Sequence, residues 1–144
     1  MGKFGAALAL VFCAGSAGAD CAPDAVELRT AGGSVVRFSV ELADDEAERA
    51  LGLMNRQRMA SSAGMLFAYQ APRHAYFWMK NTLIPLDIIF VRNDATIARI
   101  EANAAPLSLD PIPAGEPVAA VLELAGGRAA ELGITPGARV EWPR

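Results

Sequence analysis

Short apolar segments separated by turn-forming residues constrain the fold of this chain most strongly. Residues 35–42 alternate between apolar and polar side chains, which is typical of a half-buried strand. Other apolar runs of strand length occupy residues 64–69, 75–80, 86–91, 96–102, 118–124 and 139–142. Two short helices are indicated, one between Asp44 and Gly52 and one at 126–132 that ends at Gly133, and Asn93-Asp94 is typical of a hairpin turn. The pattern predicts a mainly β fold, a small single-domain β barrel or sandwich with one or two short helices.

Proline marks two further boundaries in this pattern. Pro72 is expected to separate the strand at 64–69 from the strand at 75–80, because proline cannot donate a hydrogen bond to a neighbouring strand. The segment 105–117 contains four prolines and is expected to be an ordered loop that covers one end of the core. The alternative is that this loop presents apolar side chains to a protein partner.

The N-terminal residues have the three parts of a secretory signal peptide. Lys3 precedes an apolar run over residues 4–14, and Ala17 and Ala19 occupy the positions where a cleavage site requires small residues. We therefore expect cleavage after Ala19 and an exported protein, either periplasmic or secreted.

The rest of the chain is expected to form one domain. Residues 20–34 are interpreted as a flexible N-terminal segment and residues 35–144 as a single β-rich domain. The apolar run of the signal is shorter than the roughly 20 residues that span a bilayer, and no later segment is longer. We therefore expect no membrane span.

Cysteine and charge content limit the possible classes of function. Removal of the signal takes Cys13 with it and leaves Cys21 as the only thiol, which excludes an internal disulfide. Lipid attachment at Cys13 is an alternative to cleavage, but Phe12 is bulkier than such sites accept. The formal net charge of the whole chain is −3, and its basic residues are scattered. Because nucleic-acid binding needs a concentrated basic stripe, we do not expect nucleic acid as a partner.

The segment 77–87 is the most informative motif, with the sequence Phe-Trp-Met-Lys-Asn-Thr-Leu-Ile-Pro-Leu-Asp. It places Lys80, Asn81, Thr82 and Asp87 within the most apolar part of the chain. An unpaired charge in apolar surroundings is strongly destabilising, so each charged group needs a partner. Lys80 ends one predicted strand and Asp87 begins the next. We predict a hairpin that brings these two groups within salt-bridge or water-bridged distance.

Four shorter motifs accompany this segment. They are Gly52-Leu53-Met54, Gly64-Met65-Leu66-Phe67, Val121-Leu122-Glu123-Leu124 and Gly133-Ile134. Together these motifs resemble the family of domains of unknown function called DUF192, over roughly residues 35–142. The resemblance implies a small β sandwich or barrel, often exported, with no established activity. The chain departs from many relatives at Ala138, where an acidic residue is common, and in lacking a cysteine in the segment 105–117.

Polar and aromatic side chains around the central motif predict a ligand site. The candidate ligand-binding residues are Arg49, Arg56, Trp78, Lys80, Asn81, Thr82, Asp87 and Glu123. Pockets for small molecules combine donors, acceptors and aromatic faces in this way, so we expect a small-molecule-binding or envelope-accessory protein with a small polar ligand, an anion or a carbohydrate. The alternative is a structural or protein-interaction module in which Lys80 and Asp87 form a buried pair and Trp78 fills the core.

Catalysis and metal binding have less support. A hydrolytic enzyme would use Asp87 as a general base, but the sequence pairs no nucleophile with a base, and its one histidine is His74. A copper site would use Met54, Met65, Met79 and His74, whose spacing follows no ligand motif. We therefore predict no catalytic residue, no metal site and no cofactor.

Overall fold

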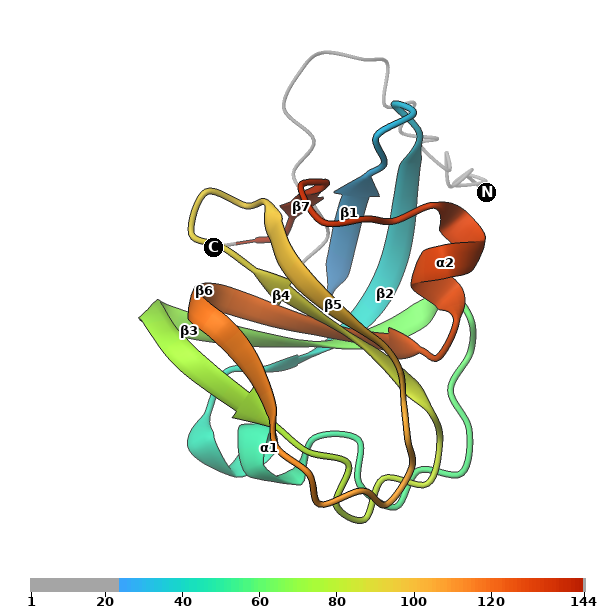
Figure 1. Cartoon of the computed structure of the whole chain (residues 1–144), viewed down its shortest axis with the longest axis vertical. Coiled ribbons are helices and arrows are strands. Elements are labelled where there is room, and N and C mark those ends of the chain that lie inside the picture. The colour runs from blue at the N-terminus through green and yellow to red at the C-terminus, as the bar shows by residue number, and fades with distance from the viewer. Residues whose placement is uncertain (1–23, 144) are drawn as a thin grey trace, which may run out of the picture.

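The computed structural model describes residues 24–143, so the predicted signal peptide and its cleavage site lie outside the described residues. The elements in this part of the chain are β1 (Ala25–Arg29), β2 (Val35–Ala43), α1 (Glu46–Leu51), β3 (Ala63–Phe77), β4 (Leu86–Val91), β5 (Ile97–Ala104), β6 (Ile112–Ala125), α2 (Arg128–Leu132) and β7 (Arg139–Glu141). Figure 1 shows β1, β2 and β7 at one end of the molecule and α1 at the other.

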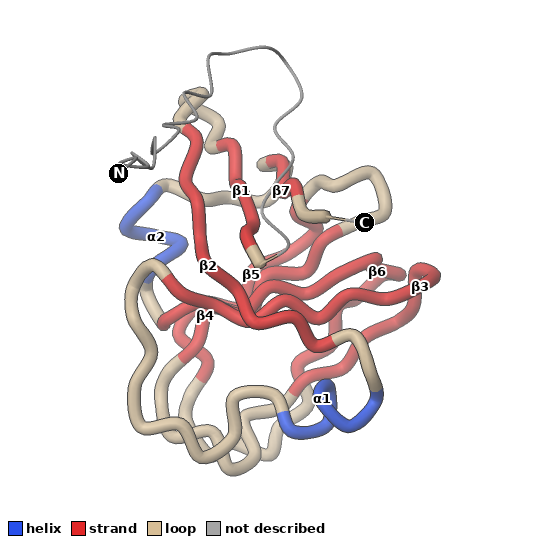
Figure 2. Tube along the Cα trace, turned by 180° about the vertical axis from the view of Figure 1, so that it is seen from behind, coloured by secondary structure: helices blue, strands red, loops and turns tan. Residues whose placement is uncertain are grey.

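All seven strands of the described chain belong to one sheet. Their order is β5-β4-β6-β3-β2-β1-β7, and every neighbouring pair is antiparallel except β2 and β3. Parallel pairing is possible there because the connection between β2 and β3 is long and carries α1. The sheet curls into a half-barrel, which Figures 1 and 2 show from opposite sides. The prediction of a mainly β, small single domain with two short helices is confirmed.

Strand β1 corrects the interpretation of residues 20–34 as a flexible segment. It pairs with β2 on one side and with β7 on the other. Val26 and Leu28 are fully buried in the core. Apolar burial and two ladders of backbone hydrogen bonds hold this strand in the fold. The β-rich domain therefore includes β1 and does not begin at residue 35.

Strand β2 keeps the predicted alternation over most of its length. Phe38 and Val40 are buried, while Arg37 and Ser39 are exposed. The alternation ends at Leu42, the last residue but one of β2, whose side chain is 43% exposed. The pattern thus locates β2 correctly and misplaces one side chain at its end.

Helix α1 begins one residue later than the pattern at Asp44 suggests. Its N-cap is Asp45, whose Oδ1 accepts the backbone N–H of Glu48 at 2.8 Å, while the Glu48 side chain accepts the N–H of Asp45. This reciprocal arrangement satisfies N–H groups that have no partner within the helix. Gly52 ends α1 and Gly133 ends α2, both with positive φ, as predicted.

Residues 63–77 form one long strand, so the prediction of two strands separated by proline is wrong. Pro72 lies at an irregularity in the pairing of β3 with β6, between Ala68 and Arg73. A bulge tolerates the missing N–H of proline, so the strand is distorted there without ending. It ends at Phe77, earlier than the pattern predicts.

Strand β6 contains the second half of the proline-rich segment 105–117, which corrects the prediction of a loop. Residues 112–117 pair with the end of β3, with Pro113 opposite Tyr76 and Pro117 opposite His74. The pairing is irregular between Ala68 and Arg73 and again between His74 and Tyr76, which leaves room for residues that donate no hydrogen bond. The connection between β5 and β6 is therefore shorter than predicted.

Strand β6 also separates β3 from β4, so the predicted hairpin around Lys80 and Asp87 is wrong. β4 pairs with β5 on one side and with β6 on the other. Because β6, from later in the chain, lies between β3 and β4, these two strands do not pair directly as a hairpin requires. The hairpin predicted at Asn93-Asp94 does form, because it joins the antiparallel strands β4 and β5.

Two buried apolar clusters hold the sheet together. The first includes residues of β1, β2, β7 and α2, and the second includes Leu53 after α1 and residues of β3 and β4. Successive residues of β6 contribute to the two clusters in turn, with Leu122 and Leu124 in the first and Val121 in the second. Because side chains alternate along a strand, Glu123 points toward the second cluster.

Candidate functional site

Glu123 lies in the middle of the sheet with apolar neighbours on both sides. Its backbone pairs with Met65 of β3 and with Ile88 of β4. Both neighbours belong to the second apolar cluster, and Glu123 is only 4% exposed. This burial raises the pKa of the Glu123 carboxyl to about 8. The carboxyl group is therefore mostly protonated at neutral pH.

The Glu123 side chain has no hydrogen-bond or ion-pair partner within residues 24–143. Among residues 24–143 no fully enclosed side-chain oxygen or nitrogen lacks a hydrogen-bond partner, so the Glu123 carboxyl is not fully enclosed by protein and faces the adjoining cavity. A protonated carboxyl offers one donor and additional acceptor capacity. This unused capacity makes Glu123 the first residue to consider for a binding site.

A cavity of about 40 Å³ lies against the Glu123 side chain. We call it the Glu123 cavity, and its lining residues are Arg49, Ala50, Leu51, Gly52, Leu53, Met54, Phe67, Phe77, Trp78, Thr82 and Glu123. The volume suffices for a few water molecules or for the small polar end of a ligand. Its wall combines α1, β3, β6 and the segment after β3, which are distant in sequence.

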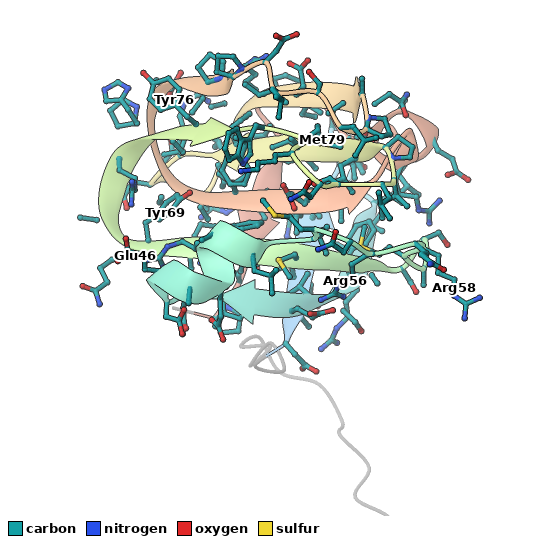
Figure 3. All side chains as sticks on the ribbon, turned by 90° about the horizontal axis from the view of Figure 1, so that it is seen from below. Glu46, Arg56, Arg58, Tyr69, Tyr76 and Met79 are labelled. Atoms are coloured by element: carbon teal, nitrogen blue, oxygen red, sulfur yellow. The ribbon has the colours of Figure 1, made fainter. Side chains whose placement is uncertain are left out.

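A larger groove of about 470 Å³ adjoins the Glu123 cavity. The two share Arg49, Ala50, Phe67, Phe77 and Trp78. We call the larger one the aromatic groove, and its other lining residues are Glu46, Tyr69, Arg73, Ala75 and Tyr76. Figure 3 looks at this end of the molecule and shows Glu46, Tyr69 and Tyr76 along one side of it. The volume is in the range of small-molecule sites.

Two arginines flank Tyr69 in the aromatic groove. The guanidinium carbons of Arg49 and Arg73 lie 5.8 and 5.1 Å from the centre of the Tyr69 ring. The Nη1 of Arg49 also donates to two backbone oxygens, which hold its guanidinium in place. Burial raises the pKa of Tyr69, the two arginine charges oppose this rise, and Glu123 adds to it. Tyr69 thus connects the electrostatics of the groove with those of the cavity.

Backbone hydrogen bonds fix the segment that carries Trp78 and Thr82. The N–H of Met79 donates to the oxygen of Ser108 at 3.0 Å, and the N–H of Leu107 donates to the oxygen of Thr82 at 3.1 Å. The loop before β6 therefore holds this segment against the cavity. Thr82 is 5% exposed, whereas Trp78 is 48% exposed and offers part of its ring to a ligand.

The structure brings part of the predicted ligand site together. The predicted residues that line the Glu123 cavity are Arg49, Trp78, Thr82 and Glu123. Lys80 and Asn81 are exposed outside it. The Lys80 Nζ lies 4.9 Å from the centre of the Trp78 ring, so Lys80 adds positive charge near the aromatic groove.

Arg56 does not line the cavity and pairs with Glu41 on the surface. Its Nη2 donates to the Glu41 Oε2 at 2.6 Å, and its Nη1 contacts the other carboxylate oxygen. The hydrogen bond from Arg56 lowers the pKa of Glu41 from its ordinary value. We therefore remove Arg56 from the candidate ligand contacts.

Asp87 lies outside the cavity, where it stabilises the fold. Its carboxylate is 0% exposed and accepts three backbone hydrogen bonds. The donors are Asn103 at 2.9 Å, Gly127 at 2.9 Å and Ala129 at 2.7 Å. The prediction of a Lys80–Asp87 pair is wrong, because backbone N–H groups stabilise the buried carboxylate while Lys80 stays at the surface.

Sequence reasoning missed Tyr69, Arg73 and Tyr76, which line the aromatic groove. They lie on the irregular half of β3, where the pairing with β6 is interrupted near Pro72. An alternation pattern does not predict which way side chains point across such irregularities. The available signal was the concentration of aromatic residues in 67–78.

The residues considered as copper ligands are divided between surface and core. His74 is exposed on β3, whereas Met65 and Met79 are buried in the second apolar cluster. Met54 lines the Glu123 cavity. In the described part of the chain, no three His, Cys, Asp or Glu side chains are grouped so as to hold a metal ion.

Comparison with known proteins places the chain in a family. The model of the DUF192 family, described as an uncharacterized ACR, matches residues 27–142. This chain belongs to the DUF192 family. The resemblance found in its motifs is thus confirmed, and the matched range contains both the cavity and the groove. The comparison of this DUF192 chain with curated proteins gives no match.

Two solved structures are similar to this DUF192 protein. A protein of Sinorhizobium meliloti, named a candidate transcription regulator, is 47% identical with a TM-score of 0.79, over 81% of this chain and 91% of the other. A protein of unknown function from Novosphingobium aromaticivorans is 48% identical with a TM-score of 0.79, over 82% and 84% of the two chains. Neither helix in the described part of this DUF192 chain has the length and apolarity to cross a membrane.

Proposed function

We propose that this DUF192 protein binds a small molecule in the aromatic groove, with one polar end of the ligand in the Glu123 cavity. The observation that carries this proposal is the Glu123 carboxyl group, which is 4% exposed, has no partner in the described chain and faces a cavity. A ligand that hydrogen-bonds to Glu123 would supply the missing partner.

The two buried carboxyl groups of the sheet support different roles. Asp87 accepts three backbone hydrogen bonds, and their contribution to the stability of the fold is sufficient to explain why it is buried. Glu123 has none, and an apolar residue at its position would pack against Met65 and Ile88 without the penalty of desolvating a carboxyl. A residue that destabilises the fold and lines a cavity favours a function in binding. Asp87 is accordingly not part of the proposed site.

The size and lining of the aromatic groove support a ligand of small-molecule dimensions. Its volume is about 470 Å³, and Tyr76 and Trp78 on its wall are 70% and 48% exposed. Exposed aromatic faces beside a few polar groups are typical of small-molecule sites. Polar organic molecules and carbohydrates remain the ligand classes that this lining favours.

We also propose that the protein is exported and matures by cleavage after Ala19. The support is the order of Lys3, the apolar run 4–14 and the small residues before Asp20. Mass spectrometry of the N-terminal peptide from the native host tests this proposal. A mature N-terminus at Asp20 is expected, and a protein that retains Lys3 in the cell would contradict export.

A role in transcription, as in the name of the Sinorhizobium meliloti protein, is less favoured for this chain. The formal net charge of −3 repels a polyanion, whereas DNA-binding domains concentrate basic residues along one face. The buried carboxyl and its cavity are explained by a small ligand and not by a duplex.

Thermal denaturation against a ligand panel tests the binding function. The panel contains neutral sugars, organic anions, organic amines and copper ions, each added to the purified full chain. A ligand present at 100 times its dissociation constant stabilises the folded state by about 2.7 kcal/mol, which raises the melting temperature by several degrees. We expect at least one class to produce such a shift.

Two variants show whether the shift arises at the proposed site. Glu123→Leu replaces the carboxyl-bearing side chain with an apolar one of similar size, so the ligand-induced shift in melting temperature should disappear. Glu131→Gln removes a carboxylate on α2 that pairs with Arg128 and does not line the groove, so the shift should persist. A shift that survives in Glu123→Leu, or no shift with any class, would overturn the proposed function.

A further inference from the structure

The aromatic groove carries more positive charge than the protein as a whole. Arg49 and Arg73 line it, and Lys80 lies over the Trp78 ring at its edge. Glu46 is the one acidic residue in its lining. The whole chain, in contrast, has a formal net charge of −3. This local excess of positive charge favours an anionic ligand group.

The arginines are placed to bind such a group. Both guanidinium groups lie over the Tyr69 ring, at 5.8 and 5.1 Å from its centre, which limits their freedom. Arg73 has no ion pair with an acidic residue in the described chain, and Arg49 donates to backbone oxygens and not to a carboxylate. Their charges are therefore available to a carboxylate, with which guanidinium groups form strong hydrogen bonds.

The remaining lining fits a flat apolar body. The aromatic side chains of the groove are Phe67, Tyr69, Tyr76, Phe77 and Trp78. Phe67 and Phe77 pack edge to face, with ring centres 4.9 Å apart, where the groove meets the Glu123 cavity. A planar ring can extend this aromatic packing from the groove toward the cavity.

We propose that the groove binds an organic anion with a flat apolar body, whose anionic end contacts Arg49 and Arg73 and whose other end has an oxygen that accepts a hydrogen bond from Glu123. This inference rests on the proposed function and adds the chemical class of the ligand. The aromatic groove holds the body, and the Glu123 cavity, at about 40 Å³, admits only the small accepting end.

The proton on Glu123 makes binding depend on pH. Burial raises the pKa of this carboxyl to about 8, and only its protonated form donates to an accepting oxygen. The charged or titratable groups around it are Arg49 from α1 and Tyr69 from β3, with Lys80 exposed beyond Trp78. Met65 and Ile88, its neighbours in the sheet, do not titrate. Affinity should therefore be constant at neutral pH and fall about tenfold per pH unit above pH 8.

Three matched probes test the class of ligand by isothermal titration calorimetry on the full chain. 4-Methoxybenzoate has the anion, the flat ring and an oxygen that accepts but does not donate. 4-Ethylbenzoate has nearly the same shape and lacks that oxygen, so it should bind roughly threefold to tenfold more weakly. 4-Methoxybenzylamine replaces the anion with a cation and should bind at least about tenfold more weakly than 4-methoxybenzoate.

Variants of the protein show which residue contacts each end of 4-methoxybenzoate. Arg73→Gln should weaken 4-methoxybenzoate about tenfold, whereas Arg139→Gln, on β7 away from the groove, should leave the affinity unchanged. Glu123→Gln keeps a donor and loses the titration, so its affinity at pH 6 should lie within about threefold of the wild type and should not fall above pH 8.

The outcomes separate this inference from the proposed function. If 4-methoxybenzylamine binds more tightly than 4-methoxybenzoate and Glu123→Leu abolishes its binding, the anionic class is wrong and the binding function stands. If 4-methoxybenzoate binds equally well to the wild type and to both Arg73→Gln and Glu123→Leu, or if no probe binds, the inference is overturned. If, in addition, no class of the ligand panel shifts the melting temperature, the proposed function is overturned as well.

Discussion

The Asp87 carboxylate accepts a hydrogen bond from the backbone N–H of Ala129 at 2.7 Å, between residues that lie 42 positions apart in the chain. The same carboxylate accepts the N–H of Asn103 at the end of β5 and that of Gly127 before α2. One buried side chain at the start of β4 thereby joins three segments of the fold. It also provides acceptors at the start of α2, whose N-cap residue Gly127 has no side chain to do so.

Asp87→Ala is expected to destabilise the protein severely. The change leaves three backbone N–H groups buried without an acceptor, and the free energy of unfolding should fall by about 3 kcal/mol or more. Urea denaturation measures the loss. Asp94→Ala is the matched control, because Asp94 accepts from Thr96 in an exposed turn and its removal should lower the free energy of unfolding far less. Equal losses in the two variants would contradict the structural role of Asp87.

Lys80 and Asp87 should contribute to stability independently. Lys80 is exposed against Trp78, while backbone groups satisfy Asp87, so the two side chains share no partner. A double-mutant cycle with Lys80→Ala and Asp87→Asn should give an interaction free energy within about 0.5 kcal/mol of zero. A coupling well above 1 kcal/mol would restore the ion pair that the sequence pattern suggests.

The stability of the protein should depend on pH through Glu123. Its pKa is about 8 in the folded state and 4.5 ordinarily, so between these values the folded state binds more protons than the unfolded state. The stability contributed by the proton is fully present below pH 4.5 and is lost as the pH rises through 8. The free energy of unfolding of the wild type, relative to Glu123→Gln, should fall by up to about 1.4 kcal/mol per pH unit in this window.

Denaturation of the wild type and Glu123→Gln at several pH values between 5 and 9 measures this difference. The comparison isolates position 123, because the amide has no titration and every other group is common to both proteins. A difference that stays constant over the whole range would mean that Glu123 is ionised throughout and has a partner.

Gly64 should not tolerate a side chain. A Cβ atom there would lie 2.6 Å from the backbone oxygen of Glu123 and 2.9 Å from the Leu124 side chain. Gly64→Ala should therefore push β3 away from β6 and lower the free energy of unfolding by about 1–3 kcal/mol. Gly32→Ala is the control, since its nearest neighbour would be the Thr30 side chain at 3.9 Å. A Gly64→Ala protein as stable as this control would contradict the close approach of the two strands.

Local patterns predicted the elements whose structure depends on neighbours in sequence. The alternation at 35–42, the turn at Asn93-Asp94 and the glycine after α2 each have a local physical cause, and each is confirmed except for the Leu42 side chain at the end of the alternation. Strand β6 between β3 and β4 depends on contacts between distant segments, which no local pattern encodes. The wrong hairpin and the wrong Lys80–Asp87 pair both follow from that one missed pairing.

The candidate site was partly accessible to sequence reasoning. Glu123 attracts attention because it is a charged residue within an apolar strand, and Trp78 because it adjoins a polar segment. Asp87 attracts attention for the same reason, yet its donors lie 16, 40 and 42 residues away. The local sequence does not show whether a buried acidic residue has hydrogen-bond partners. Only the fold distinguishes the structural carboxylate from the one that faces a cavity.

The most direct test of the account is a pH titration of the Glu123 carboxyl carbon by NMR, with ¹³C-labelled glutamate and Glu123→Gln to assign the signal. We predict a pKa of about 8 for the free protein, and a higher pKa with saturating 4-methoxybenzoate because that ligand binds the protonated form. A pKa near the ordinary glutamate value of 4.5 would contradict the buried, unpaired carboxyl on which the proposed function rests. A pKa of about 8 that saturating ligand leaves unchanged would contradict contact between the ligand and Glu123.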